Sequence, residues 1–218
     1  MRIDVLTREY PPHIYGGAGV HVAELVRVLR HRAEVHVRAF DGARDEPATD
    51  GYYPLGGGVG DASLDVLAHN LPMAKDTHGA DIVHSHTWYA NMAGHLGAQL
   101  HGVPHVISAH SLEPLRPWKA EQLGGGYRVS SWIERTAYEN ASAIIAVSAG
   151  MRDDVLRCYP DVDPDKGKVI HNGIDAEGRD VSPILWTSVL GDGPGGADAR
   201  EAGGFARAAA RGQARAGH

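Results

Sequence analysis

Residues 2–29 read RIDVLTREYPPHIYGGAGVHVAELVRVL and predict a strand, a loop and a helix in succession. The apolar run at 2–7 is typical of a buried strand. Four apolar residues then recur at helical spacing: Val22, Leu25, Val26 and Leu29. The loop between strand and helix holds two prolines and the pair Gly16-Gly17. A glycine-rich loop before a helix N-terminus either receives a phosphate or is a plain turn.

The alternation of short apolar strands and amphipathic helices continues along the chain. The further predicted strands are 34–40, 81–86, 105–110, 142–148 and 168–174. Helices are predicted between strands, with Asp61 and Ser148 as N-caps, and the segments 41–60 and 111–126 are expected to be loop. This order predicts an α/β fold, a doubly wound, Rossmann-like parallel sheet with helices on both faces. Ligands of such sheets bind at the carboxyl ends of the strands.

The composition excludes several classes of partner. The 218 residues carry a net charge of −6, and no basic stripe points to nucleic acid. No apolar run reaches the roughly 20 residues of a membrane span, so no membrane partner is predicted. Cys158 is the single cysteine, and no signal-peptide pattern is present, so we expect a cytoplasmic protein. The 14 histidines include no His-x-x-x-His zinc motif with glutamate, so no metal site is predicted, and no cofactor.

A dinucleotide-binding domain is one interpretation of the first strand-loop-helix unit. Asp41 follows the second predicted strand, where such domains place an acidic residue for the ribose. However, GGAG does not fit G-x-G-x-x-G, and the loop with two prolines is too long for the tight turn of that motif. An NAD-binding domain is therefore the less favoured interpretation.

Five motifs in order resemble another nucleotide fold. They are EYPPHIYGGAGVHVAEL, DIVHSHTWYANMAG, VISAHSLEPLRPWK, ERTAYENASAIIAVSAGMRDDV and VIHNGID, and together they span residues 1–175. The chain is similar to the N-terminal half of retaining glycosyltransferases with the GT-B fold, of families 4 and 5. Within them it most resembles the actinobacterial glycogen synthases. The resemblance implies transfer of glucose from ADP-glucose to an α-glucan or to glucose 1-phosphate, with retention, release of ADP and no essential metal.

The resemblance also implies roles on the donor side. Gly16 and Gly17 are expected to lie against the donor diphosphate, where free helix N–H groups suit an anion. His110 ends a predicted strand and is expected to contact the transferring sugar as a catalytic residue. The alternatives are a plain helix-capping turn for the glycines and a buried strand-end histidine for His110.

Acceptor contacts are expected on the same rim. A histidine and an aromatic ring suit a sugar, and basic residues suit an anionic acceptor such as glucose 1-phosphate. The predicted acceptor-binding residues are Glu9, Tyr10, His86, Trp88, Arg116 and Lys119. Core packing for the tryptophan, and solvated loop positions for the charged residues, remain the alternatives.

The composition changes after Asp175. The last 28 residues, 191–218, contain 8 Gly, 9 Ala and 4 Arg. We therefore expect two parts: a GT-B N-terminal domain at 1–175, and an irregular or disordered tail at 176–218 of the kind a shifted reading frame or a truncated gene produces. The C-terminal donor domain of the resembling enzymes is expected to be absent. The 218-residue chain alone is expected to show little transfer, and a non-catalytic sugar- or nucleotide-binding protein is the alternative function.

Overall fold

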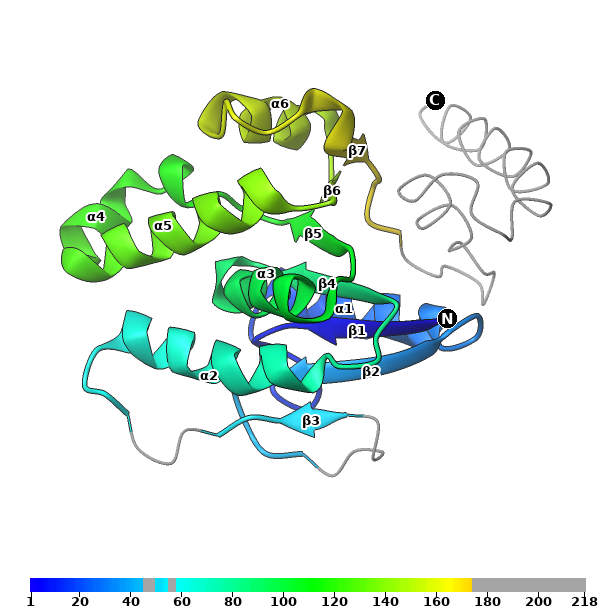
Figure 1. The fold of residues 1–218 in the computed structure, drawn as a ribbon. Helices are drawn as coiled ribbons and strands as arrows, with labels where there is room; N and C mark the ends of the chain where they lie inside the picture. The colour runs from blue at the N-terminus through cyan, green and yellow to red at the C-terminus, as the bar shows by residue number, and fades with distance from the viewer. Residues whose placement is uncertain (45–49, 55–57, 174–218) are drawn as a thin grey trace, which may run out of the picture. The chain divides into compact units, whose positions relative to one another are not determined.

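The computed structural model describes residues 1–44, 50–54 and 58–173, and these form a parallel sheet of seven strands (Figure 1). The strand order is β3-β2-β1-β4-β5-β6-β7, and all paired strands are parallel. The strands are β1 Arg2–Leu6, β2 Glu34–Ala39, β3 Gly51–Tyr52, β4 Ile82–His86, β5 His105–Ala109, β6 Ala143–Ala146 and β7 Gly167–Val169. The predicted parallel α/β sheet is confirmed.

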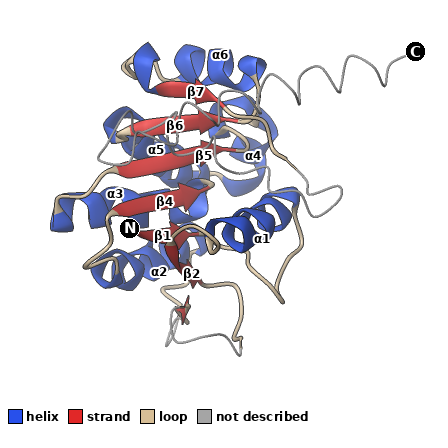
Figure 2. Ribbon diagram, turned by 90° about the vertical axis from the view of Figure 1, so that its right-hand side faces the viewer, coloured by secondary structure: helices blue, strands red, loops and turns tan. Residues whose placement is uncertain are grey.

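Helices cover both faces of this sheet. They are α1 Gly17–Leu29, α2 Ala62–Asp76, α3 Trp88–His101, α4 Pro117–Leu123, α5 Gly125–Asn140 and α6 Ala149–Cys158, with short 3₁₀ turns η1 Glu113–Leu115 and η2 Pro164–Lys166. Helix α1 lies on one face, and α2, α3 and α5 pack side by side on the other (Figure 2). The sheet is therefore doubly wound, as predicted from the alternation of strands and helices.

The ends of the helices follow the sequence signals closely. The Asp61 carboxylate accepts from the N–H groups of Ser63 and Leu64, and the Ser148 hydroxyl accepts from the N–H of Met151. Both predicted N-caps are thus confirmed. The apolar face of α1 is buried through Val22, Leu25, Val26 and Leu29. That packing fixes the direction of α1, so its first turn points at the carboxyl edge of the sheet.

Strand β7 ends at Val169, five residues before the predicted end at 174. Two further elements were not predicted. Strand β3 lies within the segment expected to be loop, because two residues suffice to pair with Arg38 and Ala39 at the sheet edge. Helix α4 lies within the other expected loop and begins at Pro117, which suits the first turn because its missing N–H needs no partner there. Both elements are too short to produce a periodic apolar pattern.

The sheet positions the functional site through its strand order. The chain leaves β1 through α1 toward β2 on one side, whereas β4 and β5 lie on the other side of β1. Pairing of Leu6 with Ser85, and of His86 with Ser108, brings the carboxyl ends of β1, β4 and β5 level. This change of direction opens the crevice in which such folds bind ligands.

Two expectations concern the C-terminal part of the chain: the domain boundary after residue 175 and the irregular tail at 176–218. Both lie outside the described residues. Among the described helices, none combines the length and the apolar character that crossing a bilayer requires.

Candidate functional site

The glycine loop before α1 holds an anion that the chain itself supplies. One oxygen of the Glu9 carboxylate, Oε2, accepts from the backbone N–H of Gly16 at 2.8 Å and of Tyr15 at 3.2 Å. The N-cap Gly16 offers no side chain, and the first turn of α1 contains no acidic residue. Glu9 therefore supplies the negative charge that a helix N-terminus favours.

The three glycines of this loop differ in what surrounds them. A Cβ on Gly16 would lie 3.2 Å from the Glu9 carboxylate, and one on Gly19 would lie 2.8 Å from it. These two glycines make room for Glu9. A Cβ on Gly17 would meet nothing within 4 Å. Of the two glycines predicted to meet the donor, Gly17 borders open space and Gly16 is engaged with Glu9.

Three histidines converge beside this loop. His86 at the end of β4 and His110 after β5 have ring nitrogens, Nδ1 and Nε2, 3.0 Å apart, and their rings are stacked with centroids 5.4 Å apart. His21 on α1 meets the ring of His110 edge-on at 5.0 Å. The predicted rim residues His86 and His110 are thus neighbours, and His21 joins them from a helix the prediction did not consider.

Burial keeps these histidines neutral. It lowers the pKa of His110 to about 4, with His21 nearby as the second cause, and it lowers the pKa of His21 as well. For His86, burial and the neighbouring histidines place the pKa well below its usual value. Neutral imidazoles can donate and accept hydrogen bonds to hydroxyl groups, and they leave their lone pairs free to bind a ligand.

The backbone between His86 and Trp88 is strained. Thr87 has φ 63° and ψ 161°, the only positive φ of a non-glycine residue among those described. A β-branched residue rarely adopts this conformation, and such strain clusters at functional sites. The Thr87 conformation turns the chain sharply, so that β4 ends at His86 and α3 begins at Trp88.

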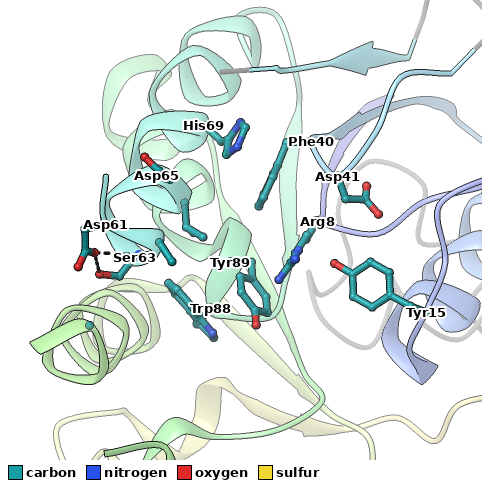
Figure 3. A pocket seen from close by; sticks show the side chains of 13 residues that line it. Arg8, Tyr15, Phe40, Asp41, Asp61, Ser63, Asp65, His69, Trp88 and Tyr89 are labelled. Atoms are coloured by element: carbon teal, nitrogen blue, oxygen red, sulfur yellow. Dashed lines mark hydrogen bonds between the residues drawn. The ribbon is translucent and has the colours of Figure 1, made fainter. Parts of the chain in front are cut away.

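A cavity of about 620 Å³ lies at the same edge of the sheet (Figure 3). Its aromatic lining is Tyr15, Phe40, Trp88 and Tyr89. The Arg8 guanidinium lies between two of the rings, 4.6 Å from the centroid of Tyr89 and 5.2 Å from that of Tyr15. The lining also holds the carboxylates of Asp41, Asp61 and Asp65. Aromatic faces with a few polar and charged groups suit a sugar.

Of the residues that line this cavity, only Trp88 was predicted from the sequence as a site residue. Trp88 lines it and also packs on Met92 and Ile133, so core packing is observed and the acceptor contact stays a prediction. Arg8 and Tyr89 were missed. Arg8 lies two residues beyond the end of β1, and Tyr89 lies three residues beyond the end of β4. Their positions just after strand ends could have indicated a binding site, because ligands bind at that edge of the sheet.

Three other predicted acceptor residues lie outside the lining of this cavity. Tyr10 is 5% exposed, and its hydroxyl accepts from Arg30. Lys119 pairs with the buried Glu113 carboxylate at 2.8 Å. Arg116 joins η1 to α4 and is partly buried. Their roles toward an acceptor remain predictions.

A second buried carboxylate anchors the loop that carries Arg116 and Lys119. Glu134 on α5 accepts from the N–H of Glu113 at 2.7 Å and from the hydroxyl of Tyr159. Burial raises the pKa of Glu134 to about 7. The η1 turn is thus tied to a carboxyl group that titrates near neutral pH.

Comparisons with known proteins find similar sequences. A family model described as Glycosyltransferase Family 4 matches residues 15–177. The chain is 58% identical over 175 residues to an alpha-maltose-1-phosphate synthase of Mycolicibacterium smegmatis, covering 80% of this chain and 45% of the relative. A glycogen synthase of Mycobacterium tuberculosis is 27% identical over 209 residues, covering 81% of this chain and 49% of the relative. The chain spans about half the length of the curated relatives it matches.

Solved structures share the fold. The Anabaena protein Alr3699/HepE, in complex with UDP, superposes with a TM-score of 0.55 at 22% identity, covering 80% of this chain and 45% of that one. A sucrose-phosphate synthase of Thermosynechococcus elongatus also gives 0.55, at 16% identity, covering 80% and 49%. At these identities the likeness establishes the fold, a Rossmann-like half of the GT-B type.

Proposed function

The chain belongs to glycosyltransferase family 4, and on this premise we propose that it forms the acceptor side of a retaining glucosyltransferase. The donor is a nucleotide sugar, ADP-glucose, and the acceptor is glucose 1-phosphate, with the end of an α-glucan as the alternative. The bond from the anomeric carbon to the diphosphate breaks, and a bond to an acceptor hydroxyl forms. ADP leaves, and the hydroxyl proton passes to the leaving group or to solvent.

The observation that carries the proposal is the Arg8 guanidinium, which lies between the Tyr15 and Tyr89 rings in the cavity. A relative named alpha-maltose-1-phosphate synthase is 58% identical to this chain over 175 residues. A guanidinium forms paired hydrogen bonds with a phosphate, and the rings pack on the apolar faces of a sugar. The described lining also holds Asp41, Asp61 and Asp65, so Arg8 is the group at which a phosphate would bind. We infer that Arg8 selects the anionic acceptor.

The neighbouring residues suit the donor. The open space at Gly17 allows a diphosphate to approach the N-terminus of α1, where N–H groups neutralise developing charge. His110 is 3.0 Å from His86, which holds the imidazole in place for hydrogen bonds to the transferring sugar. We also expect the protein to act in the cytoplasm.

The experiment is a binding titration with the 218-residue chain, because it does not depend on turnover. We expect glucose 1-phosphate to bind at least ~10-fold more tightly than glucose, and Arg8→Gln to abolish that preference, since a charge-assisted hydrogen bond contributes about 1.5–3 kcal/mol. Arg135→Gln is the matched control, because the Arg135 side chain is 60% exposed and pairs only with Glu139 among the described residues.

Equal affinity for glucose and glucose 1-phosphate would contradict the proposed acceptor. Binding of maltooligosaccharides without glucose 1-phosphate would favour the glucan acceptor instead. Measuring ADP release from ADP-glucose with the same chain separates an active transferase from a binding protein without catalysis.

A further inference from the structure

The histidine cluster has a geometry that sugar binding does not explain. One nitrogen each of His21, His86 and His110 lies within 4.8 Å of the other two. They come from three separate elements, α1, β4 and the end of β5, and a sugar hydroxyl needs only one of them. The close pair consists of His86 Nδ1 and His110 Nε2, 3.0 Å apart, so two of the three rings already turn a nitrogen toward each other.

We propose that His21, His86 and His110 bind a divalent transition-metal ion such as Zn²⁺, with the fourth coordination position open. Three imidazoles and an open position form a well-known class of zinc site. Zinc–nitrogen bonds of about 2.05 Å in a tetrahedral site set ligand nitrogens about 3.4 Å apart. The pair His86–His110, at 3.0 Å, already lies near this separation.

The remaining adjustment is small. The nitrogens now within 4.8 Å must approach to about 3.4 Å, a movement of at most about 1.4 Å, which side-chain rotation of the partly exposed His21 supplies. Binding breaks the His86–His110 hydrogen bond and replaces it with two metal bonds. In the His86–His110 hydrogen bond one of the two nitrogens carries the hydrogen, so this hydrogen has to move to the other nitrogen of its ring, or to solvent, when the ion binds.

The sequence pattern gave no sign of this site, because the three histidines are separated by 65 and 24 positions and match no zinc motif. The inference is independent of the proposed transfer reaction. If His110 does hold the donor sugar, a bound ion competes with the donor, and that consequence alone rests on the proposed function.

The test is a titration of the untagged 218-residue chain with CoCl₂ and ZnCl₂. We expect visible absorption bands of nitrogen-coordinated Co²⁺, which one equivalent of Zn²⁺ removes. His21→Ala should weaken binding at least ~10-fold. His31→Ala is the matched control, because His31 is exposed and follows directly after the same helix, and it should bind like the wild type.

His21→Ala should fold, because alanine favours the helix interior, and circular dichroism checks this. If it does not fold, His21→Gln replaces it, since glutamine keeps a polar side chain without an imidazole. Absence of the cobalt bands in the wild type overturns the proposal. Equal metal affinity of the wild type and a folded His21 variant overturns it as well.

Discussion

The stability of the chain should depend on pH through Glu134. Its pKa is about 7 in the folded protein, against an ordinary value of 4.5. Between these values the folded state binds more protons than the unfolded state, so the free energy of unfolding falls as the pH rises. At 1.36 kcal/mol per pKa unit, this difference amounts to about 3 kcal/mol between pH ~4.5 and pH ~8.

The perturbation is Glu134→Gln. The amide oxygen can still accept from the N–H of Glu113 and from Tyr159, but the side chain no longer ionises. Relative to the wild type, the variant should therefore gain about 3 kcal/mol as the pH rises from ~4.5 to ~8. Urea unfolding followed by tryptophan fluorescence measures this at several pH values.

Other ionisable groups also contribute to the pH dependence, so the quantity to compare is the difference between variant and wild type. Glu121→Gln is the matched control, because Glu121 is exposed on the neighbouring helix α4. Its difference from the wild type should not change with pH. If the difference for Glu134→Gln also stays constant across this range, the reasoning about the buried carboxyl group is refuted.

Further predictions concern the crevice. Thr87→Gly should raise the free energy of unfolding by about 1 kcal/mol in thermal denaturation, because glycine adopts the positive φ of this position without strain; a less stable variant would contradict this. Glu9→Gln should bind ADP roughly tenfold more tightly by calorimetry, because it keeps a hydrogen-bond acceptor for Gly16 but removes the negative charge that competes with the diphosphate. Unchanged or weaker ADP binding would show that Glu9 does not occupy the anion position.

Most of the fold could be predicted from the sequence, because the apolar pattern of each long element reflects burial of that element alone. Five of the seven strands, and both predicted N-caps, lie where the pattern placed them, whereas β7 covers only the beginning of the strand predicted at 168–174. Strand β3 and helix α4 were not predicted. Strand β3 is held by edge pairing, and helix α4 is tied to the buried Glu113 carboxylate through Lys119; neither contact is visible in local sequence.

For the candidate site, the sequence predicted only the edge of the sheet at which it lies. The alternation of strands and helices in the sequence predicts that the loop at Gly16-Gly17, His86 and His110 lie at the carboxyl ends of parallel strands. Which side chains meet there depends on the strand order and on helix packing, and both are seen only in the structure. The Glu9 carboxylate accepts hydrogen bonds from the N–H groups of Tyr15 and Gly16, and the Arg8 guanidinium lies between two aromatic rings. These contacts depend on distances between separate elements, which sheet register and helix packing set.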